Sequence, residues 1–408
     1  MKVLQINYSD YGRGGGASIA MHRLYTGLKN AGIDCKILSA IKTLDSPDSS
    51  QIIRSQKLEK VLKKITSNTG LNDICHVNSF KIKDNNVYQQ ADILNCHIIH
   101  SGYFNYLAIP SLTKNKPMVF TLHDMWSFTG HCAYSYDCER WKIGCGKCPY
   151  PNTYPAVARD NTSLEWKLKN WVYNHSNLSI VAPSNWLVEQ AKQSMLKNLP
   201  IHHIPYGIDT QAYQPLNSEQ CRFVLGIPAD KKVLMFGAES LKDSRKGADL
   251  LVKALSKLPE SLKAETILLT LGHGSESLAQ TVGMECLSLG YVSSDRLKSI
   301  AFSAADLFVF PTRADNLPLI LQESMACGTP MVSFKVGGVP DLVRPGITGY
   351  LANPEDANDF CSGIVQLLED NDTRDSMSQN CRAIALEEYA LEAQTKKYID
   401  MYQKTLET

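Results

Sequence analysis

Short apolar runs alternate with amphipathic helical segments along the chain, and this alternation constrains the fold more than any other feature. Residues 2–7 predict a first strand, which a glycine-rich loop and a helix ending at Gly32 follow. Further strands are predicted at 36–40, 93–97, 118–123, 178–183, 232–237, 266–271, 305–311 and 331–334. Strands that alternate with helices form parallel sheets covered on both faces, so we expect an α/β fold.

The length of 408 residues suffices for two domains of roughly 150–200 residues each. Pro and Gly cluster at residues 204–209, between two regularly patterned halves. We therefore predict an N-terminal domain at 1–204 and a second domain at 205–385. The net charge of +1 gives no electrostatic reason to expect nucleic acid as a partner.

The first residues form a short strand that turns polar too soon for a signal peptide, and no apolar run approaches the roughly 20 residues of a membrane span. A soluble cytoplasmic protein is the expectation. In such a protein, 12 cysteines indicate free thiols or a metal site, not a disulfide framework.

Two carboxylates, Asp315 and Glu323, stand eight residues apart across a loop and the first turns of a predicted helix. The helix should begin near Pro318 and end at Gly328. A helix N-terminus suits a phosphate, because it offers free amides and the positive end of the dipole. Carboxylates accept hydrogen bonds from hydroxyls, which a ribose or hexose supplies. The stretch therefore suggests a sugar-nucleotide site.

Two adjacent cations, Arg245 and Lys246, occupy the loop between strand 232–237 and the next predicted helix. They suit a diphosphate and could stabilise negative charge on a leaving group; a solvated charged loop is the alternative interpretation. The first glycine-rich loop, from Gly12 through Gly14 to Ala17, loosely matches a dinucleotide fingerprint. That fingerprint needs an acid at the end of the second strand, and 36–40 ends without one, which disfavours NAD.

Together these motifs resemble those of the retaining glycosyltransferases of family 4, whose hallmark is two glutamates eight residues apart before a Met-Ala-x-Gly-x-Pro run. This chain has Glu323 and the run from Met325 to Pro330, with Asp315 in place of the first glutamate. Lys246 is present with its following glycine, while Ala238 stands where an arginine is usual. A segment with a His-Asp-x-Trp start and a Cys-x-x-Cys-Pro end is similar to one in polysaccharide-assembly members.

The resemblance implies the GT-B fold, in which two Rossmann-like parallel-sheet domains face each other across a cleft and a C-terminal helix, here about 386–408, packs back on the first. It implies retaining transfer of a hexose-type sugar from a nucleotide-diphosphate sugar to a hydroxyl of a glycan or lipid-linked acceptor, without a cofactor for catalysis. By the same resemblance, the catalytic residues are His123, Lys246 and Asp315. The implied donor-binding residues are Gly15, Gly16, Arg245, Lys246, Asp315, Asn316, Leu317, Leu319 and Glu323.

A dense cysteine cluster follows His123, and its members are Cys132, Cys138, Cys145 and Cys148. Four thiolates satisfy a tetrahedral structural zinc site, with His131 as an alternative ligand, whereas unligated thiols are the other interpretation. Residues 54–67 predict an amphipathic helix that carries four lysines. Such a helix can lie on an anionic membrane, which would make the protein peripheral on the inner membrane face, or it can be an ordinary surface helix.

Two other functions share this architecture. A sugar-nucleotide epimerase would need no acceptor, and a non-catalytic glycan-binding scaffold would need no turnover. Asp315 and Ala238 depart from the family pattern, and these departures are the reason to retain the scaffold function as an alternative. The base, the sugar, the acceptor, the linkage and the oligomeric state are not predicted from the sequence.

Overall fold

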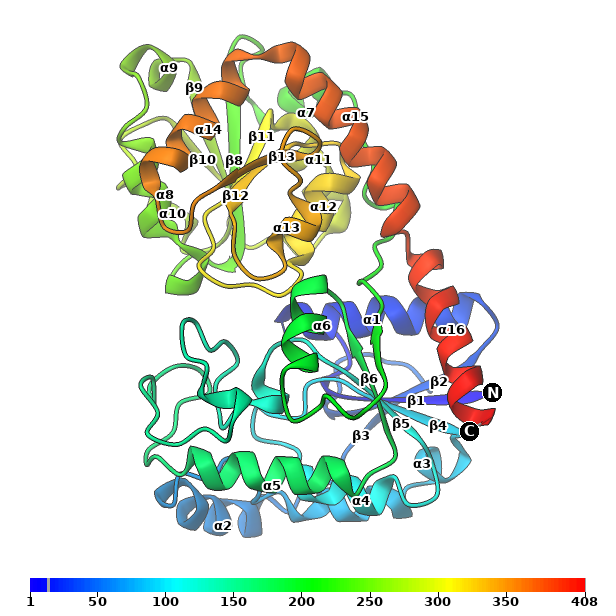
Figure 1. Cartoon of the computed structure of the whole chain (residues 1–408). Helices are drawn as coiled ribbons and strands as arrows, with labels where there is room; N and C mark the ends of the chain where they lie inside the picture. The colour runs from blue at the N-terminus through cyan, green and yellow to red at the C-terminus, as the bar shows by residue number, and fades with distance from the viewer. Residues whose placement is uncertain (13–14, 408) are drawn as a thin grey trace. The chain divides into compact units, whose positions relative to one another are not determined.

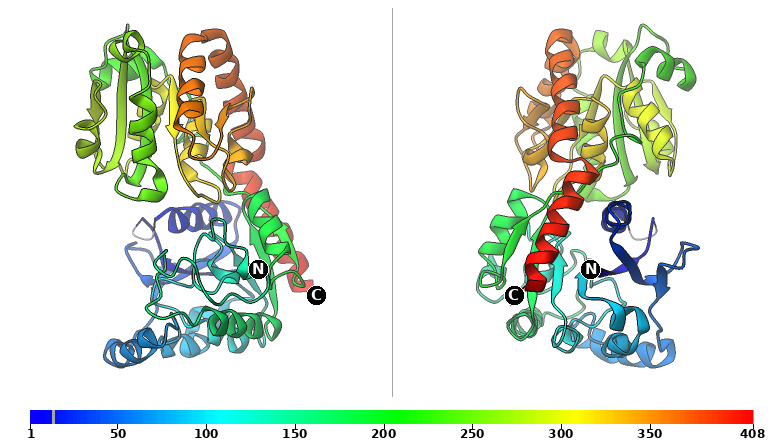
Figure 2. Two further views of the ribbon diagram at one scale, coloured as in Figure 1. Left: turned by 60° about the vertical axis from the view of Figure 1, so that its left-hand side comes forward. Right: turned by 90° about the vertical axis from the view of Figure 1, so that its right-hand side faces the viewer.

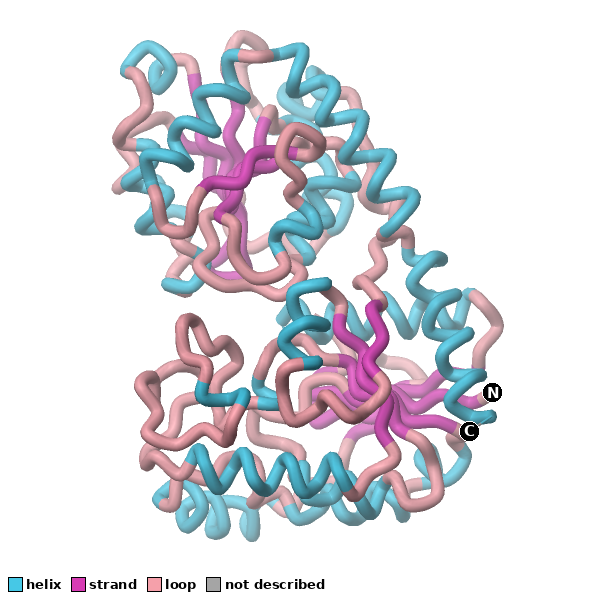
Figure 3. The backbone as a smooth tube through the Cα atoms, viewed as in Figure 1, coloured by secondary structure: helices cyan, strands magenta, loops and turns pink. Residues whose placement is uncertain are grey.

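The computed structural model describes residues 1–12 and 15–407, and it divides into two compact units. Unit 1 comprises Met1–Tyr206 with Gln394–Thr408, and unit 2 comprises Gly207–Ala393. Each unit is built on one all-parallel sheet, and Figure 3 shows the strands of each sheet gathered inside a shell of helices and loops. No helix among the described residues is long and apolar enough to cross a bilayer. Figure 1 labels the elements of both units.

The sheet of unit 1 has seven strands in the order β3-β2-β1-β4-β5-β6-β7. Its strands are β1 (Lys2–Ser9), β2 (Asp34–Ile41), β3 (Ser49–Gln51), β4 (Ile93–Cys96), β5 (Met118–Thr121), β6 (Leu178–Ala182) and β7 (Ile201–His203). Its helices are α1 (Gly15–Asn30), α2 (Gln56–Asn68), α3 (Asn86–Gln90), α4 (Ile109–Leu112), α5 (Thr162–Asn174) and α6 (Asn185–Lys192), with most of α16 (Leu391–Glu407).

Alternating side chains of these strands feed two separate cores, as expected for a sheet covered on both faces. Val3 and Val119 pack toward α1 and α16, while Leu4 and Phe120 pack toward α4 and α5. Buried hydrogen bonds tie α16 to the sheet, because the Asn95 side chain donates to the Tyr402 hydroxyl at 2.7 Å and the Thr121 and Tyr398 hydroxyls lie 2.9 Å apart. The two further views in Figure 2 follow α16 along unit 1.

The sheet of unit 2 has six strands in the order β10-β9-β8-β11-β12-β13. Its strands are β8 (Lys232–Ser240), β9 (Thr266–His273), β10 (Cys286–Ser288), β11 (Leu307–Phe310), β12 (Met331–Phe334) and β13 (Gly349–Ala352). Its helices are α7 (Ser218–Leu225), α8 (Ala248–Leu255), α9 (Glu260–Ala264), α10 (Ser275–Ala279), α11 (Asp295–Ala304), α12 (Leu319–Ala326), α13 (Val339–Leu342), α14 (Ala357–Glu369) and α15 (Asn371–Glu388).

The predicted α/β architecture with two parallel-sheet domains is confirmed, but some local predictions are wrong. The expected single helix at about 386–408 is interrupted, because α15 ends at Glu388 and Ala390 forms a parallel bridge with Ile208 before α16 begins. Residues of the glycine-rich loop are also helical earlier than expected, since α1 already begins at Gly15. Gly14 lies outside the described residues.

Candidate donor site

The loops that follow β8 and β11 meet at the point of unit 2 where the strand order reverses, between these two neighbouring strands. In open α/β sheets, ligands bind at the carboxyl ends of the strands at such a point. The loop after β8 carries Arg245 and Lys246, and the loop after β11 carries Asp315. The tertiary structure thus brings three predicted site residues together from two segments of the sequence.

Gly247 lets these two loops approach each other closely. Its φ of +74° lies in the left-handed region, and a Cβ at this position would lie 1.9 Å from the Pro311 carbonyl oxygen. Next to it, the Arg313 N–H donates to the Arg245 carbonyl at 2.8 Å, and the Thr312 hydroxyl donates to the same oxygen at 3.1 Å. Only glycine fits both the conformation and the contact.

Lys246, Arg245 and Asp315 form a mostly buried ionic cluster. The Lys246 ammonium donates to Asp315 Oδ2 at 2.8 Å, and Arg245 NH1 lies 3.0 Å from Asp315 Oδ1. The Thr312 hydroxyl donates to Asp315 Oδ2 at 3.0 Å. The predicted phosphate cation and the predicted sugar-binding carboxylate therefore contact each other, which the sequence did not indicate.

The cluster shifts the pKa of both charged partners. Burial by itself raises the pKa of Asp315, but the charges of Lys246 and Arg245 outweigh it, and the net pKa lies below its ordinary value. Burial lowers the pKa of Lys246, against the opposing attraction of Asp315. A carboxylate with a lowered pKa is ionised at neutral pH, so Asp315 is an acceptor of hydrogen bonds there and not a proton donor.

The helix α12 begins directly after this cluster. Pro318 is its N-cap and supplies no side-chain cap, so the first amides of the helix, starting with Leu319, have no acceptor within the helix. The helix starts one residue later than predicted and stops just before Gly328. Asn316 and Leu317, which lead into it, are buried. A glycine also supports this loop, because the Gly338 N–H donates to the Asp315 carbonyl at 3.1 Å.

Glu323 is only 4% exposed on α12, and its carboxylate lies 3.7 Å from the Lys298 ammonium. Lys298 also donates to the Tyr213 hydroxyl at 3.1 Å, and that hydroxyl donates to Asp295 at 2.6 Å. Sequence reasoning missed Lys298, Tyr213 and Thr312. The only signal is the spacing of Asp295 and Lys298 on one helix, which any surface helix can show.

His123 lies in unit 1, two residues beyond the end of β5, and both of its ring nitrogens have partners. His97 Nε2 lies 2.7 Å from Gln5 Oε1, His97 Nδ1 lies 3.0 Å from His123 Nε2, and the Tyr206 hydroxyl lies 2.7 Å from His123 Nδ1. Because the Gln5 oxygen only accepts, a neutral His97 accepts at Nδ1, His123 donates from Nε2, and Tyr206 donates to His123.

Burial lowers the pKa of His123 to about 4, so the ring is neutral at neutral pH. In this arrangement His123 positions Tyr206, and a contact from either ring nitrogen to a sugar would require breaking one of the two hydrogen bonds. Its predicted catalytic role stays a prediction. A second buried pair lies beside it, because His100 Nε2 is 3.0 Å from the Asp124 carboxylate.

The remaining predicted residues also lie in unit 1. Gly15 and Gly16 form the first turn of α1, and Gly15 has a φ of +67°. The four clustered cysteines line one pocket in the segment after His123, which is described below.

Two family models match this chain. The model described as Glycosyltransferase Family 4 matches residues 14–212, and the one described as Glycosyl transferases group 1 matches residues 217–384. Among curated relatives, a putative colanic acid biosynthesis glycosyl transferase, WcaC of Escherichia coli, is 29% identical over 59% of this chain and 59% of its own length. The sulfoquinovosyl transferase SQD2 of Arabidopsis thaliana is 31% identical over 47% of this chain and 37% of its own length.

Solved structures match over nearly the whole chain. Sucrose-phosphate synthase from Thermosynechococcus elongatus has a TM-score of 0.72 at 19% identity and covers 99% of both chains. Anabaena HepE in complex with UDP has a TM-score of 0.69 at 16% identity, over 99% of this chain and 100% of its own. At these identities the likeness concerns the fold. Because the two family models together span most of the sequence, the chain belongs to the family 4 and group 1 glycosyltransferases, with the GT-B fold.

Proposed function

We propose that this chain is a retaining glycosyltransferase that moves a sugar from a nucleotide-diphosphate sugar to a hydroxyl of a glycan or lipid-linked acceptor in surface polysaccharide synthesis. The observation that carries the proposal is the convergence of Arg245 and Lys246 with the uncapped start of α12 and the buried Glu323. Cations and helix amides suit a diphosphate. A buried carboxylate suits the hydroxyls of a ribose.

Each group then has one task. Lys246 and Arg245 hold the diphosphate with the amides that begin at Leu319. Asp315 accepts a hydrogen bond from a sugar hydroxyl, with a shorter reach than the glutamate usual in the family, and Glu323 accepts from the ribose. Because Asp315 already contacts both cations, it also keeps them in place before the donor binds.

The reaction breaks the bond between C1 of the sugar and the diphosphate oxygen, and the electron pair leaves with the nucleoside diphosphate. A new bond forms between C1 and the acceptor oxygen, on the face that the diphosphate leaves. The proton of the acceptor hydroxyl passes to a diphosphate oxygen. The side chains of Lys246 and Arg245 lower the barrier by stabilising the negative charge that develops on the leaving group.

Relatives support two finer parts of the proposal. WcaC is named for colanic acid biosynthesis, which supports a polysaccharide acceptor, and HepE was solved with UDP, which makes UDP the first nucleotide to test. The chain spans 59% of the length of WcaC and 37% of the length of SQD2. The acceptor and the donor of this chain therefore need experiments of their own.

The test compares UDP, GDP, ADP and NAD in a thermal-shift panel on the wild type and on Glu323→Gln, which keeps the shape of the side chain and removes its charge. We expect one nucleoside diphosphate to raise Tm in the wild type. In Glu323→Gln its affinity should fall by about 10- to 100-fold, because hydrogen bonds to a charged acceptor are worth about 1.5–3 kcal/mol. The matched control is Glu369→Gln, an exposed glutamate of unit 2.

Turnover assays with the matching nucleotide sugar separate the alternatives. Release of nucleoside diphosphate that depends on added acceptor supports transfer. Interconversion of the donor without an acceptor would instead identify an epimerase. The absence of a shift with any nucleoside diphosphate would contradict the donor site and favour a scaffold.

We further propose that α2 holds the protein on an anionic membrane surface. The apolar side chains Leu58, Val61 and Ile65 are 49%, 61% and 59% exposed on this peripheral helix, beside exposed lysines. The buried side of the helix instead carries Glu59, which pairs with Arg54 at 2.6 Å. A surface helix ordinarily buries its apolar stripe, whereas a helix that lies in a bilayer interface exposes one flanked by cations.

Flotation with vesicles tests this contact. We expect binding to vesicles that contain phosphatidylglycerol and not to pure phosphatidylcholine. The triple variant Leu58→Ser, Val61→Ser, Ile65→Ser should weaken binding at least about tenfold, because each exposed side chain loses apolar burial. The control variant Phe223→Ser, Val224→Ser removes apolar groups of α7 that are 86% and 67% exposed, and it should leave binding unchanged. Equal binding to both vesicles, or no effect of the triple variant, would contradict the proposal.

A further inference from the structure

The segment between β5 and α5, residues 122–161, has almost no regular secondary structure. Its described helices are two single 3₁₀ turns, η3 (Trp126–Phe128) and η4 (Arg140–Lys142). Loops longer than about 12–15 residues without their own secondary structure are uncommon in compact domains. This one is nevertheless packed, since Trp141 within it is only 2% exposed. Its aromatic side chains Trp126, Phe128 and Trp141 belong to the hydrophobic core of unit 1, whereas little of the segment is held by regular secondary structure.

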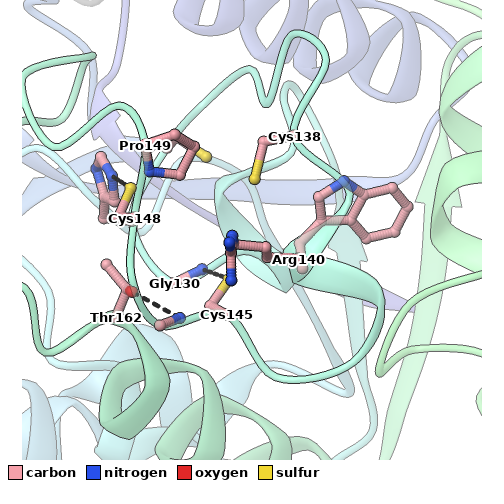
Figure 4. Close-up of a pocket in the computed structure, with 11 residues that line it drawn as sticks. Gly130, Cys138, Arg140, Cys145, Cys148, Pro149 and Thr162 are labelled. Carbon is pink, nitrogen blue, oxygen red and sulfur yellow. Dashed lines mark hydrogen bonds between the residues drawn. The ribbon is translucent and has the colours of Figure 1, made fainter.

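Four cysteines and a histidine of this segment line one pocket. The cysteines are Cys132, Cys138, Cys145 and Cys148, and the histidine is His131. All four thiols are free, so no disulfide links this segment. In Figure 4 the labelled sulfur atoms come from different parts of the loop and point toward the same pocket.

Two of the sulfur atoms already have hydrogen-bond partners, and one of these partners is a backbone N–H, the kind of donor that a metal thiolate uses. The Gly130 N–H donates to Cys145 Sγ at 3.2 Å, and His131 Nε2 lies 3.2 Å from Cys148 Sγ. His131 Nδ1 lies 2.8 Å from the Pro155 carbonyl, which only accepts, so Nδ1 carries the proton of the neutral ring. The unprotonated Nε2 therefore accepts a hydrogen bond from the Cys148 thiol, and His131 lines the pocket. An outer hydrogen bond such as the one from Gly130 orients and stabilises a metal ligand.

The backbone of the Cys145–Cys148 turn is strained. Cys145 and Lys147 have φ values of +53° and +48°, and Gly144 and Gly146 also have positive φ. A non-glycine residue in this region costs of order 1–3 kcal/mol and persists only where the surroundings require it. Here the turn brings Cys145 and Cys148, which two residues separate, onto one pocket wall.

We propose that this pocket binds one Zn²⁺ through the four cysteine thiolates. Soft thiolates favour zinc over the hard cations Mg²⁺ and Ca²⁺, and four of them complete a tetrahedral shell. In the described part of the chain, no group of three or more His, Cys, Asp or Glu side chains is placed so that it could hold a metal ion, so the thiols of this pocket must move before all four can bind one. Because Zn–S bonds are about 2.3 Å long, binding must draw the thiols inward and tighten the loop.

A four-thiolate shell leaves no open coordination position, so the ion has a structural and not a catalytic task. It braces the segment that follows His123 and Asp124. The inference rests on the pocket alone and is independent of the proposed donor site in unit 2. A protein that binds nucleotide but no zinc, or the reverse, therefore distinguishes failure of one proposal from failure of the other.

The test measures metal in the full-length, untagged protein. We expect about one zinc per chain by elemental mass spectrometry. After replacement by Co²⁺, we expect the intense visible bands of a tetrahedral site and a thiolate charge-transfer band in the near ultraviolet. Both signals should be lost in Cys145→Ser and in Cys148→Ser. The matched control, Cys286→Ser, replaces a partly exposed cysteine of unit 2 and should retain them.

Chelation gives a second readout that does not depend on variants folding. Because metal binding energy is folding energy, removal of zinc should lower Tm by several degrees and open the loop to limited proteolysis. The proposal is overturned if the wild type binds neither zinc nor cobalt, if Cys145→Ser binds a full equivalent, or if four of the thiols are found as disulfides.

Discussion

Replacing Lys246 by methionine is expected to lower kcat/KM for sugar transfer by about 10²–10³-fold, the usual effect of removing one preorganised group that stabilises a developing charge. The Lys246 ammonium is held between Asp315 at 2.8 Å and the Phe310 ring at 5.1 Å, so its position costs no reorganisation during the reaction. Methionine keeps much of the apolar stem and removes the charge. Steady-state kinetics with the nucleotide sugar identified by the thermal-shift panel would measure the loss.

Two variants separate chemistry from folding in this experiment. Lys242→Met removes an exposed lysine from the same loop and should leave kcat/KM unchanged. The double variant Lys246→Met, Asp315→Asn removes both partners of the pair, so it should recover part of the stability that the single variant loses when the buried Asp315 carboxylate keeps Arg245 as its remaining cation. It should not recover turnover. A Lys246→Met enzyme as active as the Lys242→Met control would contradict the assigned role.

Gly247→Ala is expected to destabilise unit 2 by about 2–4 kcal/mol, the sum of a left-handed alanine and an overpacked contact. The added Cβ would lie 1.9 Å from the Pro311 carbonyl oxygen, so the two loops must separate. Because Lys246 adjoins this glycine and Asp315 lies on the opposite loop, nucleotide affinity should fall with stability. Urea unfolding and nucleotide titration would measure the two effects.

Gly226→Ala is the matched control, because Gly226 has nearly the same φ of +71°, but a Cβ added there would have no described heavy atom within 4 Å. This substitution should lower the free energy of unfolding by only about 1 kcal/mol, because it adds the strain of a left-handed alanine but no steric contact. The difference between the two variants isolates the close approach of the loops. Equal costs would mean that the contact with Pro311 is not needed.

The position of a strand in its sheet explains whether it could be predicted from the sequence. Strands in the interior of each sheet, such as β5 and β11, are buried on both faces and form short apolar runs. The missed strands are the edge strands β3, β7, β10 and β13. They are short and partly polar or exposed, so they carry little hydrophobic signal.

The same limit applies to faces of helices. Periodicity in residues 54–67 predicted an amphipathic helix, and α2 covers Gln56–Asn68. Periodicity does not say which face is buried. In the structure Glu59 is buried and paired with Arg54, while the apolar residue Val61 is exposed.

The sequence by itself determined the α/β class and the two-domain organisation, and it predicted the residues of the candidate site, because apolar periodicity and residue type are local properties. It singled out Lys246, Asp315 and Glu323 as separate motifs. Only the tertiary structure decided that Lys246 and Asp315 pair, that His123 is engaged on both nitrogens, and that four cysteines share a pocket. Those contacts join segments far apart in the chain, and their distances depend on how strands and loops pack.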